Sequence, residues 1–178
     1  MKYPITCILG KRGSYKTCFM TKLAYDYHHE GKTIISNYHL IGIPYTYMPF
    51  SALAQLPESL YNAVVLMDEI QVGADAYEIF ARGNKAITKF ATQLRKRKIT
   101  LYYSTQIFTQ VTKRLRLQTD YIIQCEEIKQ APGYSKISIF DRGLPFNEQK
   151  IKELLFNGKP YFSMYDTDEV ISYGDENE

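Results

Sequence analysis

Short apolar runs alternate with longer amphipathic segments along most of the chain. Six runs rich in β-branched residues have the length of strands, and several are apolar throughout, as strands buried on both faces are. They are Ile5–Leu9, Thr33–Ser36, Val64–Met67, Ile99–Ser104, Tyr121–Cys125 and Ile137–Phe140. Apolar residues at helical spacing predict helices over 16–29, 85–97 and 147–156. Strands that alternate with helices predict an α/β fold, with a mostly parallel central sheet flanked by helices.

Composition places the chain among soluble globular proteins. It has 178 residues, of which 45% are hydrophobic and 23% charged. We expect one domain over residues 1–165 and an acidic tail over 166–178. The apolar runs are too short to cross a bilayer, and no signal-like segment opens the sequence, so a cytoplasmic location is expected. The three cysteines and three histidines lack the spacing of ligand sets, which predicts no metal cluster.

Charge is distributed unevenly, although the net charge is only +3. Residues 82–116 carry ten basic side chains and no acidic ones. Such a surface suits a phosphate backbone, so this segment is a candidate for contact with nucleic acid. The alternative is a solvated helix face whose arginines serve contacts between subunits. The candidate DNA contacts are Lys96, Arg97, Lys98, Lys113, Arg114 and Arg116.

A glycine-bearing loop joins the first predicted strand to the first predicted helix. It consists of Gly10, Lys11, Arg12, Gly13, Ser14, Tyr15, Lys16 and Thr17, and Cys18 follows it. This matches the phosphate-loop pattern GxxxxGK[ST] except at Tyr15, where glycine is usual. Backbone N–H groups of such a loop bind phosphate at a helix N-terminus. Lys16 is expected to reach the β- and γ-phosphates of ATP, and Thr17 to bind Mg²⁺.

Two readings of this loop stay open. The alternative to a nucleotide site is a glycine-bearing turn with a chance Lys-Thr pair. Within the nucleotide reading, Tyr15 restricts the backbone because it has a Cβ atom. One hypothesis is that its ring lies beside the nucleotide.

Two carboxylates, Asp68 and Glu69, follow the apolar run Val64–Met67. Ligands of open parallel sheets bind beyond the carboxyl ends of the strands, so this pair should lie opposite the phosphate loop. Asp68 is expected to hold Mg²⁺, and Glu69 to orient and polarise the attacking water. Gln106, just beyond the next strand, can hydrogen-bond the γ-phosphate or that water. The alternative at each position is a solvated polar turn.

These elements, in this order, resemble the FtsK/HerA superfamily of DNA-pumping ATPases. Within it, the sequence is most similar to the genome-packaging ATPases of tailless viruses and to the Zot-like assembly ATPases of filamentous phages. The resemblance extends over residues 3–126. It rests on the loop 10–17, on 31–37 with its terminal Asn37, on Asp68 to Gln71, and on 93–106.

The resemblance implies a RecA-like P-loop NTPase fold, ATP hydrolysis with Mg²⁺, and a ring of subunits, most often a hexamer, around double-stranded DNA. Positions that match the family's catalytic and metal-binding residues are Lys16, Thr17, Asp68, Glu69 and Gln106. The family also implies an arginine that completes a neighbouring subunit's site. Arg82, Arg95 and Arg97 are candidates, and Arg95 lies nearest the family's arginine-bearing helix end.

The favoured hypothesis is an ATPase that packages viral double-stranded DNA into a capsid. Its expected place is the host cytoplasm or the virion, with a capsid or membrane-associated viral protein as a further partner. A Zot-like assembly or export ATPase would share the active site but act at a membrane. A small P-loop nucleoside or nucleotide kinase would instead use the basic segment as a lid over a second phosphate site.

Overall fold

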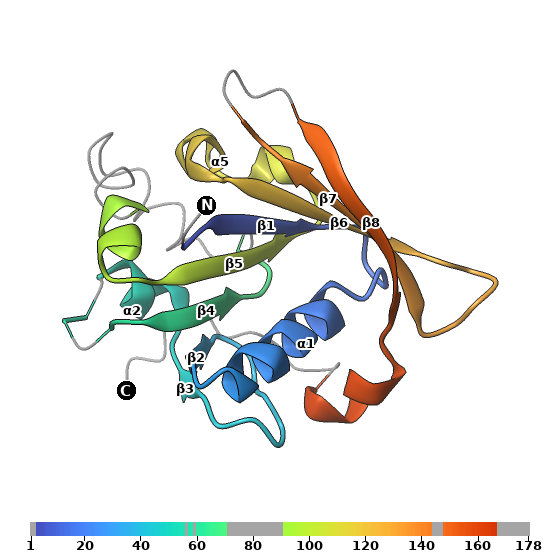
Figure 1. Ribbon diagram of the computed structural model, residues 1–178, viewed down its shortest axis with the longest axis horizontal. Coiled ribbons are helices and arrows are strands. Elements are labelled where there is room, and N and C mark those ends of the chain that lie inside the picture. Colours follow the sequence, from blue (N-terminus) through green and yellow to red (C-terminus); the bar gives the residue numbers. More distant parts are fainter. Residues whose placement is uncertain (1–2, 56, 59, 71–90, 144–147, 167–178) are drawn as a thin grey trace, which may run out of the picture.

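The computed structural model describes residues 3–55, 57–58, 60–70, 91–143 and 148–166. In this part of the chain, helices lie on both faces of one eight-stranded sheet (Figure 1). The strands are β1 (Ile5–Leu9), β2 (Thr33–Ser36), β3 (Thr46–Tyr47), β4 (Ala63–Met67), β5 (Thr100–Thr105), β6 (Tyr121–Glu127), β7 (Tyr134–Asp141) and β8 (Gln149–Asn157). The helices are α1 (Lys16–His29), α2 (Phe50–Ala54) and α5 (Lys113–Gln118), with 3₁₀ turns η1 (Phe108–Gln110) and η2 (Lys159–Met164).

The sheet has a parallel part and an antiparallel part. Its order is β3-β2-β4-β5-β1-β6-β7-β8. The pairs from β3 to β6 are all parallel. Strands β7 and β8 extend the sheet beyond β6 through antiparallel pairs. The structure therefore confirms the predicted α/β class with a mostly parallel sheet.

Two hydrophobic clusters fill the spaces between the sheet and the helices. On one face, α1 buries Phe19, Met20 and Ala24 together with sheet residues such as Ile8. On the other face, α2, α5 and the helical residues 91–96 cover β1, β4 and β5. Burial on both faces explains why β4 reads as an unbroken apolar run.

Most of the predicted elements are confirmed. Strands β1 and β2 and helix α1 have the predicted bounds, and the other predicted strands differ by a few residues at their ends. Residues 91–96 are helical, as part of the helix predicted over 85–97. The remainder of that helix before Ala91 lies outside the described residues, as does the predicted acidic tail beyond Asp166.

The helix predicted over 147–156 is wrong, because Gln149–Asn157 forms the edge strand β8. Its sequence is rich in Lys, Glu and Leu, which favour a helix in isolation. In the fold, Leu154 and Phe156, two residues apart, pack into the α1-side cluster, while backbone groups pair with β7. Sheet pairing thus overrides local propensity here.

Candidate nucleotide site

The residues predicted to act on the nucleotide lie at the carboxyl ends of the parallel strands. The end of β1, Leu9, pairs with Thr105 at the end of β5, and Met67 at the end of β4 pairs with Tyr103. The phosphate loop (residues 10–17), the Asp68-Glu69 pair and Gln106 follow these strand ends directly. The parallel topology therefore brings three segments, distant in sequence, to the same place.

The conformation of the phosphate loop depends on two glycines and a serine. A Cβ atom on Gly10 would lie 2.5 Å from the carbonyl oxygen of Cys125, so a larger residue does not fit there. Gly13 has a φ of 79°, which glycine adopts without strain. The N–H and the hydroxyl of Ser14 both donate to the Lys11 carbonyl oxygen, at 3.2 and 2.7 Å.

Lys16 lies inside the loop and is buried. Its Nζ donates to the Lys11 carbonyl oxygen at 3.1 Å. Burial lowers the pKa of the Lys16 ammonium, while the carboxylates of Asp68 and Glu69 oppose that shift. The Lys16 ammonium thus lies within electrostatic range of the two carboxylates, in the loop that is predicted to bind the β- and γ-phosphates. The loop residues Lys11, Arg12 and Gly13 are exposed.

Asp68 is joined to the phosphate loop and to β5 by hydroxyl groups. The Thr17 hydroxyl donates to Asp68 Oδ2 at 2.6 Å, and the Ser104 hydroxyl donates to Asp68 Oδ1. Burial raises the pKa of the Asp68 carboxyl, against the hydrogen bonds from Ser104 and Thr17 and the charge of Lys16. Mg²⁺ in nucleotide sites takes one or two protein oxygens together with phosphate oxygens and water. The hard oxygens of Thr17 and Asp68 fit that ion.

Asn37, at the end of β2, fixes the backbone of Asp68. Its side-chain amide donates to the Asp68 carbonyl oxygen at 3.0 Å and accepts from the Asp68 N–H at 2.7 Å. In the sequence, Asn37 stands out only through the family resemblance, which assigns it no role. The available signal was a polar residue that ends a buried strand.

Glu69 and Gln106, both predicted to be catalytic, are in contact. The Gln106 side-chain amide donates to Glu69 Oε1 at 3.1 Å. Glu69 has a φ of 49°, unusual for a residue other than glycine. Its N–H donates to Asp68 Oδ1 at 3.1 Å and to the Ser104 hydroxyl at 2.9 Å. These two hydrogen bonds fix the orientation of the Glu69 backbone just beyond the end of β4.

Tyr15 makes contacts that the sequence did not indicate. Its backbone is left-handed, with φ 66° and ψ 30°. Its ring stacks on Phe162 of η2, with centroids 5.8 Å apart, and its hydroxyl accepts from the Gly133 N–H at 3.0 Å. A position of this ring beside the nucleotide stays a prediction.

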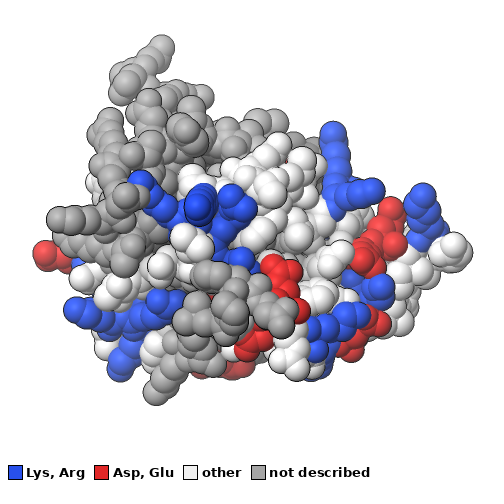
Figure 2. Space-filling view, turned by 90° about the horizontal axis from the view of Figure 1, so that it is seen from above, with Lys and Arg blue, Asp and Glu red and all other residues white. Residues whose placement is uncertain are grey.

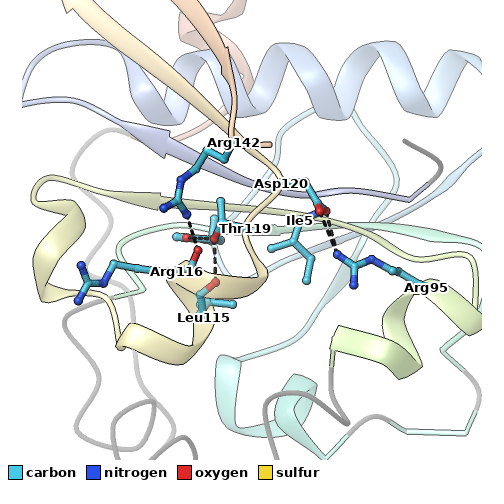
Figure 3. Close-up of polar contacts among 8 residues, drawn as sticks. Ile5, Arg95, Leu115, Arg116, Thr119, Asp120 and Arg142 are labelled. Atoms are coloured by element: carbon cyan, nitrogen blue, oxygen red, sulfur yellow. Dashed lines mark hydrogen bonds and ion pairs between the residues drawn. The ribbon is translucent and has the colours of Figure 1, made fainter. Parts of the chain in front are cut away.

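Arg95 lies at the opposite, amino-terminal ends of the parallel strands. Its Nη2 donates to both carboxylate oxygens of Asp120, at 3.0 and 3.1 Å, and Asp120 also accepts from the N–H of Ile5 at 2.9 Å (Figure 3). Ile5 begins β1, whereas the phosphate loop follows its end. A role of Arg95 in a neighbouring subunit's site stays a prediction. Arg82 lies outside the described residues.

The candidate DNA contacts fall into two groups. Lys96, Arg97 and Lys98 follow one another at the end of the helical residues 91–96, and the second group lies on α5. Lys96, Lys98 and Lys113 are exposed, whereas Arg97, Arg114 and Arg116 are half-buried. Lysine and arginine side chains gather in several separate groups on the face in Figure 2, and acidic side chains lie between some of them.

Some of these cations also make contacts within the chain. Arg97 Nη1 donates to the Pro57 carbonyl oxygen at 2.7 Å. The Arg116 guanidinium lies 5.8 Å from the centre of the Phe108 ring. Both arginines therefore stabilise the fold, whether or not they also contact DNA. Cys18, predicted to complete the nucleotide segment, is buried, and its thiol donates to the Gly158 carbonyl oxygen at 3.4 Å.

Comparison with known proteins places the fold. No family model matches the chain, and the comparison with curated proteins found no match. The N-terminal domain of zonular occludens toxin from Neisseria meningitidis is 15% identical, with a TM-score of 0.57, and the match covers 92% of this chain and 100% of that one. The genome packaging NTPase of Sulfolobus turreted icosahedral virus 2, in complex with ATPγS, is 14% identical, with a TM-score of 0.58 over 84% of this chain and 96% of that one.

A KaiC-like protein from Pyrococcus horikoshii is 11% identical, with a TM-score of 0.54 over 87% of this chain and 85% of that one. These likenesses confirm the RecA-like P-loop NTPase fold. They also confirm, at the level of fold, the resemblance to viral packaging and Zot-like proteins. None of the helices in the described ranges has the length and apolar character needed to span a membrane.

Proposed function

We propose that this chain is a Mg²⁺-dependent ATPase that moves double-stranded DNA, most directly into a viral capsid. The observation that carries the ATPase assignment is the meeting of three segments at the carboxyl ends of the parallel strands. Lys16 and Thr17 of the phosphate loop lie next to Asp68, and Glu69 beside it contacts Gln106. A glycine-bearing turn with a chance Lys-Thr pair would not require a buried carboxylate bonded to Thr17.

In this proposal each side chain has a defined part. The loop N–H groups and Lys16 bind the β- and γ-phosphates. Thr17 and Asp68 hold Mg²⁺, which neutralises charge on the phosphate oxygens when it is bound. Glu69 accepts a hydrogen bond from the attacking water and polarises it, while Gln106 holds the Glu69 carboxylate.

The DNA part of the proposal is supported by charge and by the comparisons. Residues 82–116 carry ten basic side chains and no acidic ones, which suits a non-specific grip on phosphates. One structural neighbour is named as a genome packaging NTPase. We infer a ring of subunits, with a hexamer favoured, whose basic segments face the duplex, and an arginine such as Arg95 that acts on the neighbouring site. The inferred location is the host cytoplasm or the virion, with a capsid or membrane-associated protein as recruiter.

A second candidate is a Zot-like assembly or export ATPase that acts at a membrane. The match to the zonular occludens toxin domain favours it, because it covers 92% of this chain. This candidate shares the nucleotide chemistry and differs in the partner. It predicts ATP hydrolysis that duplex DNA does not stimulate.

The decisive experiment measures phosphate release from ATP with and without Mg²⁺, with and without duplex DNA, across a salt series. We expect Mg²⁺-dependent release that DNA stimulates, and stimulation that fades steeply with salt because phosphate contacts release counterions. Hydrolysis indifferent to DNA would favour the assembly ATPase, and phosphate transfer to a nucleoside would exclude both.

Two variants test the residue assignments. Glu69→Gln should retain ATP binding but lose nearly all turnover, because the amide cannot polarise the water. Glu127→Gln, an exposed carboxylate on β6, is the matched control and should behave like the parent protein. Full activity of Glu69→Gln would refute the mechanism. Lys16→Ala should lose ATP affinity first, since Lys16 contacts phosphate in the ground state.

A further inference from the structure

Tyr15 ties the phosphate loop to a distant part of the chain. Its hydroxyl accepts a hydrogen bond from the Gly133 N–H, in the turn between β6 and β7. Its ring stacks on Phe162 of η2 at an interplanar angle of 20°. Gly133 and Phe162 belong to segments that are themselves joined, because the Gly158 N–H donates to the Gly133 carbonyl oxygen at 2.8 Å. The β6–β7 turn and η2 therefore form one support for this residue.

Two neighbouring contacts strengthen the same connection. The buried Ser135 hydroxyl lies 3.2 Å from the Ser14 carbonyl oxygen and 3.0 Å from the Glu126 carbonyl oxygen, and either of them can accept its single hydrogen. The Cys18 thiol donates to the Gly158 carbonyl oxygen at 3.4 Å. Residues 14, 15 and 18 thus each contact the β6–β7 hairpin or the segment at the start of η2.

The Tyr15 backbone needs such support. A left-handed conformation brings Cβ close to the following carbonyl oxygen, which is unfavourable for every residue except glycine. A strained residue of this kind persists only where surrounding contacts hold it. In most phosphate loops glycine occupies this position and needs no support. Here the support comes from Gly133 and Phe162.

We propose that Tyr15 is a positioning residue for ATP. Its contacts with Gly133 and Phe162 hold the phosphate loop in the conformation that binds the β- and γ-phosphates. The turn and η2 therefore contribute to ATP affinity without touching the nucleotide. This proposal rests on the proposed ATPase function.

Two adjacent aromatic residues of η2 allow a matched test. Phe162 contacts Tyr15, whereas Tyr161 packs on Tyr25 of α1 at 6.1 Å and on Phe156 of β8 at 5.9 Å. Both replacements, Phe162→Ala and Tyr161→Ala, remove aromatic packing from the same 3₁₀ turn. Among the ring contacts of the described residues, the one with the phosphate loop belongs to Phe162.

The experiment measures ATP affinity, KM, kcat and thermal stability for the parent protein and these variants. Phe162→Ala should weaken ATP binding and raise KM by about 3- to 10-fold, the range that one aromatic pair can produce in an equilibrium constant. Its kcat should stay within about twofold, since the residue does not touch reacting groups. Tyr161→Ala should lower stability but leave ATP affinity within about twofold.

Substitutions at Tyr15 itself separate positioning from space filling. Tyr15→Ala keeps the strained Cβ and loses the support, whereas Tyr15→Gly loses both. Alanine should therefore weaken ATP binding more than glycine does, although glycine removes more atoms. Tyr15→Phe, which keeps the ring and loses only the hydrogen bond to Gly133, should retain most of the ATP affinity of the parent protein. The double variant Tyr15→Gly/Phe162→Ala should bind ATP no worse than Tyr15→Gly alone.

The outcomes separate this proposal from the function on which it rests. If Phe162→Ala changes ATP affinity no more than Tyr161→Ala does, the positioning role is wrong while the ATPase assignment stands. If Tyr15→Ala binds ATP as well as Tyr15→Gly does, the role is likewise wrong. If the parent protein binds no ATP, the ATPase assignment fails and this proposal fails with it.

Discussion

Replacing Asn37 with alanine should both destabilise the protein and misplace the metal-binding carboxylate. The last parallel pair between β2 and β4 joins Ser36 to Leu66. Beyond it, the side chain of Asn37 takes over from backbone pairing and bonds both the N–H and the carbonyl oxygen of Asp68. Asn37 is only 4% exposed and Asp68 5%, so water has little access to these groups.

The size of the effect follows from the two backbone groups that alanine would leave unpaired. Each buried, unsatisfied polar group costs about 1–3 kcal/mol, which gives a loss of about 2–6 kcal/mol in the free energy of unfolding. A typical protein has only about 5–15 kcal/mol in total. With a urea slope of about 2 kcal/mol per M, the unfolding midpoint should fall by about 1–3 M.

Urea denaturation followed by circular dichroism measures this loss, and kcat for ATP measures the displacement of Asp68. The matched control is Gln124→Ala, which removes a side-chain amide whose bond to Glu126 is exposed. The control should change the free energy of unfolding by less than about 0.5 kcal/mol. A loss of under about 1 kcal/mol for Asn37→Ala, with kcat unchanged, would refute the reasoning, because it would mean that these backbone groups find other partners.

Two further predictions concern groups outside the phosphate loop. Asp120→Asn weakens the pair with Arg95, whose side chain is 35% exposed, so the loss of stability should be about 1–2 kcal/mol. Urea denaturation measures this loss, and an unaltered midpoint would contradict the assigned pairing. Burial raises the pKa of the Cys7 thiol to about 12, so its contribution to stability is complete below the ordinary value of 9.0 and is lost as the pH rises from there towards 12. As the pH rises from 9.0 to 10.5, the free energy of unfolding of Cys7→Ala should therefore fall by about 2 kcal/mol less than that of the parent protein. Urea denaturation at each pH measures both values, and an equal fall in the two proteins would count against the raised pKa.

The elements that sequence predicted correctly are those with a local signal. Strand β1, the phosphate loop and α1 follow one another without a break, and each has its own pattern of apolar or glycine residues. The edge strand β8 has no such signal, because its pairing with β7 decides its conformation. Helix propensity therefore misled the prediction there.

The contacts that the sequence did not reveal join residues far apart in the chain. Asn37 and Asp68 are 31 residues apart, Tyr15 and Gly133 are 118, and Ile5 and Asp120 are 115. Each of these bonds exists because the sheet topology brings two strand ends or turns together. A motif search finds the ends of the strands, but it does not show which side chain crosses from one end to the next.

Backbone strain links the two halves of the site. Tyr15 and Glu69 both have positive φ, and both belong to the proposed nucleotide machinery. Tyr15 is held from the β6–β7 turn and η2, whereas the Glu69 N–H is held by Ser104 of β5 and by Asp68. Because strained residues keep their conformation only while such contacts last, the site's geometry depends on segments on both sides of β1. The β6–β7 turn and η2 therefore support the proposed nucleotide site, although they carry none of its predicted catalytic residues.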